Sequence, residues 1–87
     1  MNRQQYNISI QTYQVGGYVN SFCASILFSN TGTQNVMLMN SFLLIPGATL
    51  RIEANEGEED VTRYIFSFIG SGAPSLTVFI KNYVDSK

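Results

Sequence analysis

The chain has 87 residues, of which 45% are hydrophobic and 13% are charged, and its formal net charge is −1. This length and hydrophobic content predict one folded domain, residues 1–87, although an ordinary soluble domain has about 25% charged residues. With no histidine and one cysteine, Cys23, the chain lacks the groups for Ser-His or Cys-His catalysis and for the usual zinc sites. We therefore expect no catalytic residue, no cofactor and no metal, and the lack of a basic cluster argues against nucleic acid.

The first part of the chain predicts two strands joined by a flexible turn. Residues 6–12 alternate apolar and polar side chains, which is typical of a half-buried strand. The pair Gly16-Gly17 predicts the turn. Residues 18–29 predict the second strand, in which Cys23 is expected to be a small buried hydrophobic residue. The inner face of this strand is expected to carry Phe22, Ala24, Ile26 and Phe28.

The stretch from Asn30 to Phe68 organises the chain, and an apolar hairpin lies at its centre. If Asn40 and Ser41 form a two-residue turn, residues that face each other across the hairpin share one face of the sheet. The face assigned to the domain core then carries Val36, Leu38, Leu43 and Ile45. The opposite face carries four interface candidates: Met37, Met39, Phe42 and Leu44. A two-layer domain buries one face of each sheet, so this second group needs a cover, either the N-terminal segment or another chain.

Three more strands are expected after the hairpin, at residues 50–54, 61–69 and 76–83. Pro46-Gly47 predicts the turn that precedes the first of them. Alternation in the second strand places Tyr64, Phe66 and Phe68 on one side and Arg63, Ile65, Ser67 and Ile69 on the other. Alternation in the third strand places Leu76, Val78 and Ile80 opposite Thr77, Phe79, Lys81 and Tyr83.

About seven short strands separated by Gly, Pro and Asn turns predict an all-β fold. The expected architecture is a small antiparallel β-sandwich, either Ig-like or jelly-roll-like. No stretch shows the period of an amphipathic helix, and no apolar run reaches the roughly 18 residues that span a bilayer, so no membrane is expected as a partner.

The acidic loop at residues 55–60 is the one charge cluster of the sequence. Its carboxylates, Glu56, Glu58, Glu59 and Asp60, are hard oxygen ligands of the kind that bind Ca²⁺. Their spacing fits no EF-hand loop, and adjacent carboxylates rarely provide the separation that acid–base hydrolysis needs. We interpret the loop as a solvated turn that protects a strand edge.

The five tyrosines offer a different function, a stacking platform for sugars. They are Tyr6, Tyr13, Tyr18, Tyr64 and Tyr83. Tyrosine is equally common in strands and at interfaces, so the tyrosines alone do not support glycan binding.

A recurrent pattern runs through the middle of the chain and consists of Phe28, Asn30, Gly32, Val36, Leu38, Asn40, Pro46, Gly47, Leu50, Tyr64, Phe66 and Phe68. This pattern resembles that of small structural proteins of tailed bacteriophages. In those proteins F-x-N-x-G is followed by a V-x-I-N-G-like hairpin, L-x-P-G-x-S-L, an acidic turn and a Y-x-I-x-F strand. The match covers a little under half of the chain; Ser41 replaces the usual glycine and Thr49 the usual serine. The resemblance implies a virion component, such as a decoration, tail-accessory or adaptor protein, and implies no catalytic residues.

The expected function is therefore that of a non-enzymatic structural subunit, held with other virion proteins in a symmetric homo-oligomeric assembly. Since the N-terminal residues are polar and lack a signal-peptide core, we expect synthesis in the host cytoplasm and a place in the virion. The alternative is a small carbohydrate-binding module that uses surface tyrosines. An assembly subunit is expected to be oligomeric in solution, whereas a glycan-binding module is expected to be a soluble monomer.

Overall fold

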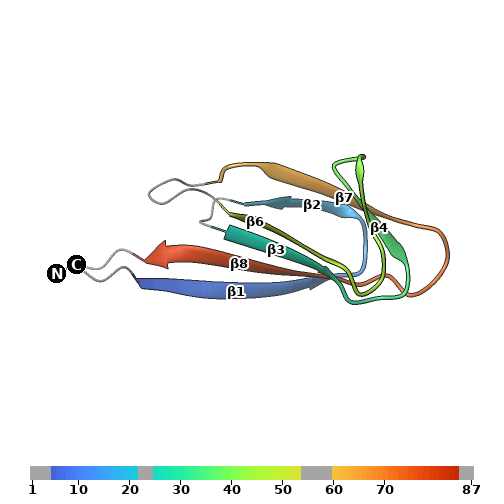
Figure 1. The fold of residues 1–87 in the computed structure, drawn as a ribbon, viewed down its shortest axis with the longest axis horizontal. Coiled ribbons are helices and arrows are strands. Elements are labelled where there is room, and N and C mark those ends of the chain that lie inside the picture. The colour runs from blue at the N-terminus through green and yellow to red at the C-terminus, as the bar shows by residue number, and fades with distance from the viewer. Residues whose placement is uncertain (1–4, 22–24, 54–59, 85–87) are drawn as a thin grey trace.

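The computed structural model describes residues 5–21, 25–53 and 60–84, and every regular element in these ranges is a β-strand. The strands are β1 (Gln5–Tyr13), β2 (Gly17–Asn20), β3 (Ser25–Asn30), β4 (Asn35–Leu38), β5 (Phe42–Leu44), β6 (Thr49–Glu53), β7 (Arg63–Ile69) and β8 (Leu76–Val84). They form two antiparallel four-stranded sheets, with the strand orders β1-β8-β3-β6 and β2-β7-β4-β5 (Figure 1). The predicted all-β sandwich is confirmed, with eight strands rather than about seven.

The pairing pattern is that of one long hairpin rolled into a sandwich. The tip is the β4–β5 hairpin, and successive pairs follow outward from it as β3 with β6, β2 with β7, and β1 with β8. Rolling adds the pairs β3 with β8 and β4 with β7, which complete the two sheets. This is the strand order of a jelly roll, one of the two architectures that the sequence predicts.

The core lies between the two sheets and follows the alternation of the strands. Phe66 is 2% exposed and Ile26 is 1% exposed, so the predicted inner faces of β7 and β3 are confirmed. Edge-to-face ring contacts join the sheets: Phe28 meets Tyr64 and Tyr13 meets Phe66, each with 5.2 Å between ring centroids. The buried hydrophobic residues are Val19, Ile26, Phe28, Val36, Leu38, Leu44, Tyr64, Phe66, Leu76 and Val78.

The single strand predicted at residues 18–29 is wrong, because β2 and β3 belong to different sheets. Ser21 marks the end of the first of them: its N–H donates to the Thr62 carbonyl at 2.9 Å, and its side chain is buried. The inward side chains are odd-numbered in β2 (Val19) and even-numbered in β3 (Ile26), so the parity changes between the two strands. The expected inner positions Phe22 and Ala24, and Cys23, lie outside the described residues.

The two faces of β1 are also opposite to what its alternation suggests, because its apolar residues point outward. Ile8 and Ile10 pair with Lys81 and Phe79 on the outer face of the sheet and are 55% and 60% exposed. The inward side of β1 is polar except for Tyr13, which packs against the core. The apolar side of this strand therefore faces away from the sandwich.

The turns that follow β1, β3, β5 and β7 meet at the end of the molecule far from the termini (Figure 1). Asn30 is buried at this end, with 1% of its surface exposed, and its hydrogen bonds hold the turns together. Its side-chain N–H₂ donates to the carbonyls of Gln34 and Leu44, and its Oδ1 accepts from the N–H of Gly32. The Gly47 N–H donates to the Asn30 carbonyl, so the Pro46-Gly47 turn is bonded to the same residue.

Candidate interaction surface

Apolar side chains cover the outer face of the β2-β7-β4-β5 sheet. Tyr18 of β2 lies opposite Ile65 of β7, and Met37 of β4 lies opposite Leu43 of β5. We call the following residues the outer apolar face: Tyr18, Met37, Met39, Leu43 and Ile65. Met37 is half-buried, and the other four are 43–55% exposed. The residues of this surface come from all four strands of the sheet and from the β4–β5 turn, so it is continuous across the sheet.

The β4–β5 turn holds Met39 on this surface. Met39 and Asn40 have φ angles of 55° and 56°, and the Ser41 N–H donates to the Leu38 carbonyl at 3.0 Å, which is a type I′ turn. A methionine in this left-handed conformation costs about 1–2 kcal/mol. The Met39 N–H donates to the Ile65 carbonyl at 2.7 Å, and the Met39 thioether lies 3.4 Å from the Ile65 N–H. These contacts with β7 offset the strain and fix the turn against the sheet.

The turn begins one residue earlier than predicted, which makes the predicted register wrong. Leu38 pairs with Phe42, and Val36 pairs with Leu44. A shift of one residue moves every side chain of a strand to the opposite face. Leu43 and Ile45, which were assigned to the core, are therefore 45% and 55% exposed.

The four predicted interface residues do not lie together. Leu44 is 1% exposed and belongs to the core of its own chain. Phe42 is 46% exposed but has the inward parity of Leu38, its partner across the hairpin. Met37 and Met39 remain on the outer apolar face, where Tyr18, Leu43 and Ile65 join them. Alternation in the sequence places Ile65 on the side of its strand opposite Phe66. This alternation is the sequence signal that identifies the outer apolar face.

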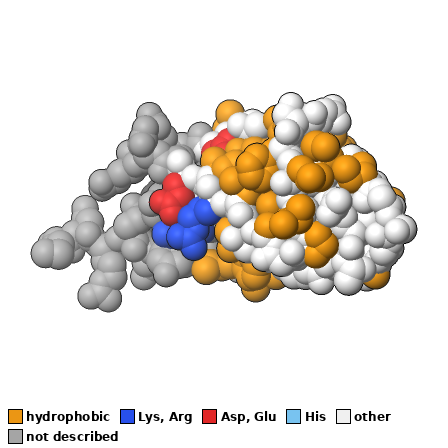
Figure 2. Space-filling view, turned by 45° about the vertical axis from the view of Figure 1, so that its right-hand side comes forward, with side chains coloured by type: hydrophobic (Ala, Val, Ile, Leu, Met, Phe, Trp, Pro, Cys, Tyr) orange, Lys and Arg blue, Asp and Glu red, His pale blue; other side chains and the backbone are white. Residues whose placement is uncertain are grey.

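Charge is confined to the margin of the outer apolar face. The Arg63 guanidinium lies over the Tyr18 ring, 4.6 Å from its centroid, and its Nε donates to the Asn20 side chain at 3.3 Å. Between Arg3 and Arg51 the sequence contains no charged residue at all. On the side of the molecule shown in Figure 2, hydrophobic side chains form several patches, and charged side chains gather beside the residues drawn in grey.

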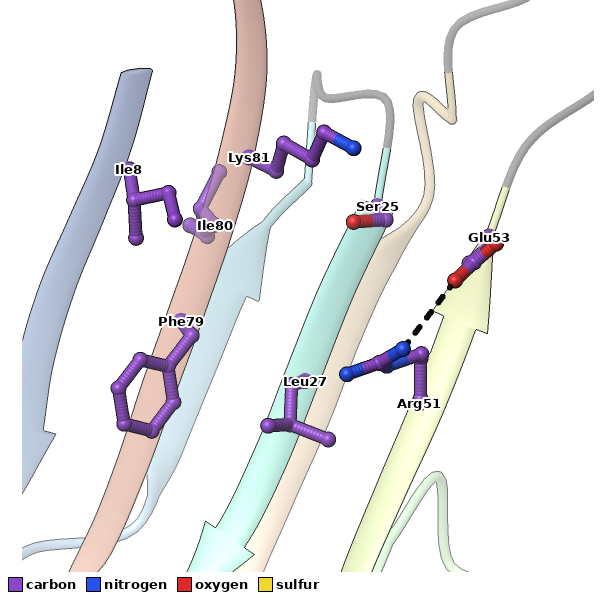
Figure 3. Close-up of a pocket in the computed structure, with 8 residues that line it drawn as sticks. All are labelled: Ile8, Ser25, Leu27, Arg51, Glu53, Phe79, Ile80 and Lys81. Atoms are coloured by element: carbon purple, nitrogen blue, oxygen red, sulfur yellow. Dashed lines mark ion pairs between the residues drawn. The ribbon is translucent and has the colours of Figure 1, made fainter. Parts of the chain in front are cut away.

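A shallow hollow of about 290 Å³ lies on the outer face of the other sheet (Figure 3). Leu27 and Phe79 form its floor on neighbouring strands, and Ile8 lies on the β1 side. Arg51 and Glu53 border the β6 side as an ion pair with a separation of 3.5 Å. Both side chains of this pair are at least 60% exposed, so the pair contributes little to stability. The hollow can bury apolar surface.

Asp60 forms a polar network at the end of the molecule near the termini. Its carboxylate accepts hydrogen bonds from the Thr62 N–H at 2.9 Å, the Tyr64 hydroxyl at 2.5 Å and the Ser21 hydroxyl at 3.1 Å. Burial raises the pKa of Asp60, but the hydrogen bonds from Thr62, Tyr64 and Ser21 outweigh it and hold the pKa below its ordinary value. The solvated-turn interpretation is therefore wrong for Asp60, which is a structural anchor. Glu56, Glu58 and Glu59 lie outside the described residues.

The described part of the chain holds no group of three or more Cys, Asp or Glu side chains that could bind a metal ion, and no helix that could cross a bilayer. The described tyrosine side chains do not form a stacking platform, because Tyr64 is buried and Tyr13 packs against the core. Tyr18 is exposed on the opposite side of its sheet, and the side chains of Tyr6 and Tyr83 lie outside the described set. Comparisons of the chain with protein-family models, curated proteins and solved structures found no match.

Proposed function

We propose that this protein is a non-enzymatic structural subunit of a tailed-bacteriophage virion, present in several copies and in contact with other virion proteins. The observation that carries the proposal is the outer apolar face, which spans a whole sheet and is free of charged side chains except at its margin. Exposed apolar patches rimmed by polar residues mark sites of protein–protein contact. The roles of head decoration, tail accessory and adaptor are all compatible with such a surface.

The jelly-roll topology supports the same proposal at the level of architecture. Jelly rolls occur in viral capsid proteins and also in lectins, so the fold by itself assigns no function. The residues that resemble phage structural proteins occupy positions that define the fold. Asn30, Gly32 and Gly47 belong to the hydrogen-bonded corner between the sheets, and Phe66 lies in the core. The resemblance thus concerns the construction of the sandwich, and the outer apolar face is the additional feature that favours an assembly subunit over a glycan-binding module.

The assembly contact is tested by placing a charge on the outer apolar face. Ile65→Glu should reduce the mass measured by light scattering and leave the circular dichroism spectrum unchanged, because an unpaired charge in a desolvated contact is costly. Thr49→Glu is the matched control, since it adds the same charge at an exposed position on the outer face of the other sheet. If Ile65→Glu and Thr49→Glu have the same mass as the parent protein, the outer apolar face makes no contact between copies.

The virion assignment has a separate test. Particles are produced from the genome that encodes this chain and are purified through a density gradient. The protein should remain with the particles, and Ile65→Glu should lower its amount per particle while Thr49→Glu should not. A protein that separates completely from intact particles would show that it is not a virion component.

A further inference from the structure

Strand β1 is the one edge in the described sandwich that has no protection against pairing with another chain. A sandwich of two four-stranded sheets has four edge strands, here β1, β6, β2 and β5. Proteins protect such edges with short strands, charges or proline. β2 has four residues, β5 has three and is soon followed by Pro46, and β6 carries Arg51 and Glu53. β1 has nine residues, none of them charged and none of them proline or glycine.

The side chains of β1 add to this tendency. Ile8 and Ile10 point to the outer face and are 55% and 60% exposed. Asn7, Ser9 and Gln11 alternate with them and are also exposed. A strand that is apolar on one face and uncharged on the other, with unpaired backbone groups along its edge, can add to a second strand through main-chain hydrogen bonds.

The order of side chains in β1 makes the strand complementary to itself. Ser9 is the middle residue of Gln5–Tyr13, so an antiparallel pair centred on Ser9 uses all nine residues of both copies. In this register Ile8 faces Ile10 of the second copy, and Asn7 faces Gln11 of the second copy. Directly opposed residues share a face, so the isoleucines of both copies form one apolar cluster and the amides pair on the opposite side. Moving the centre by one residue, to Ile8 or Ile10, also preserves the faces but leaves a single isoleucine pair and shortens the paired segment. Moving it by two residues removes both Ile8–Ile10 contacts.

We propose that β1 pairs antiparallel with β1 of a second copy of this chain, around a two-fold axis at Ser9, so that two β1-β8-β3-β6 sheets become one continuous sheet. Such an isologous contact uses the same surface on both subunits and closes after two copies. The inference deepens the proposed function and rests on it for the assembly of several copies. The outer apolar face lies on the other sheet, so it stays open for contacts with further copies and with other virion proteins.

Single cysteines test the register directly. In a Cys23→Ser background, Ser9→Cys should form a disulfide-linked dimer under mild oxidation. Opposed Cα atoms in an antiparallel pair lie about 4.5–5.5 Å apart, which is within disulfide range. Asn7→Cys and Gln11→Cys are matched controls that should form no disulfide-linked dimer when oxidised alone and should cross-link with each other when mixed. Equal cross-linking of all three single variants, or none for Ser9→Cys, would overturn the proposed pairing.

Charges at the two isoleucines provide an independent test without a covalent bond. The double variant Ile8→Lys/Ile10→Lys places lysines opposite each other and should weaken dimerisation at least tenfold. The double variant Ile8→Lys/Ile10→Glu places lysine opposite glutamate in both halves of the pair and should dimerise at least tenfold more tightly than the double lysine variant. Both positions are more than half exposed, so the folded monomer should accept either change, as checked by circular dichroism. Equal dimerisation of the two variants would contradict the pairing of Ile8 with Ile10.

The two proposals fail in different ways. If Ser9→Cys cross-links but the protein is absent from particles, the virion assignment is wrong and the β1 pair stands. If the protein remains with particles through its outer apolar face but Ser9→Cys behaves like Asn7→Cys, the β1 pair is wrong and the virion assignment stands.

Discussion

The side-chain amide of Asn30, in β3, donates a 2.8 Å hydrogen bond to the carbonyl of Leu44, in β5, and so joins the two sheets through their buried interior. Both residues are 1% exposed, so water cannot replace this bond. Asn30→Ala should lower the free energy of unfolding by about 3 kcal/mol or more, since several buried groups lose their partner at about 1–3 kcal/mol each. Chemical denaturation measures the change. A loss below about 1 kcal/mol would show that the Asn30 network is not required.

A glycine at position 32 is required by the packing of two turns. A Cβ atom on Gly32 would lie 2.3 Å from the Ala73 carbonyl oxygen and 2.6 Å from the Ser75 nitrogen, both of which are backbone atoms. Gly32→Ala should therefore destabilise the protein by about 1–3 kcal/mol, as overpacking does. Gly17→Ala is the matched control, because a Cβ there meets nothing within 4 Å. The control should be neutral or slightly stabilising in thermal denaturation, and an equal loss in both variants would contradict the packing argument.

Neighbouring residues in β7 should respond very differently to truncation. Phe66 is 2% exposed and its ring contacts both Tyr13 and Phe68, so Phe66→Ala should cost about 3–5 kcal/mol. Ile65 is 48% exposed on the other face, and Ile65→Ala should change the monomer's stability by about 0.5 kcal/mol or less. Urea unfolding under conditions where the protein is monomeric compares the two. Similar losses would mean that the faces of β7 are wrongly assigned.

Acid should weaken the end of the sandwich that Asp60 anchors. The pKa of Asp60 in the folded protein lies below its ordinary value of 3.8, so its carboxylate contributes stability above that value. This contribution is lost as the pH falls through the lowered pKa. Asp60→Asn should be less stable than the parent at neutral pH, and the difference should shrink below about pH 4. Melting temperatures measured from pH 7 down to pH 2 test this, and a difference that stays constant over the range would contradict the assignment.

Alternation predicted the fold where a strand has one clearly apolar side and a normal length. The inner residues of β7 and β8 and the outer position of Ile65 follow directly from it, and the structure confirms them. The same rule was insufficient for β1, where the apolar side faces outward because β1 is an edge strand and Tyr13 makes its main core contact. Residues 18–29 exceed the usual strand length of about 5–6, and this was the available signal that they form two strands.

The outer apolar face was only partly predictable, because its composition depends on the β4–β5 turn. A two-residue turn at Asn40-Ser41 and the observed turn at Met39-Asn40 differ by one position, and this difference exchanges Leu43 with Leu44. Methionine rarely takes a positive φ angle, so local preference favoured the wrong turn. The hydrogen bond from the Met39 N–H to the Ile65 carbonyl fixes the turn at Met39-Asn40. It joins the β4–β5 turn to β7, which is far away in the sequence.

The pairing of Gln5 with Val84 has a consequence for the rate of folding. β1 is made before β8 and cannot complete its hydrogen bonds until β8 has been made, because β8 is its neighbour in the sheet. Chains dominated by such distant contacts fold in about milliseconds to seconds, whereas helical bundles fold in microseconds to milliseconds. During this delay both hydrogen-bonding edges of β1 are unpaired. Nascent chains on neighbouring ribosomes can then pair with one another through their β1 strands. Slow synthesis or crowding of nascent chains should therefore increase misassembly more than it would for a domain built from local contacts.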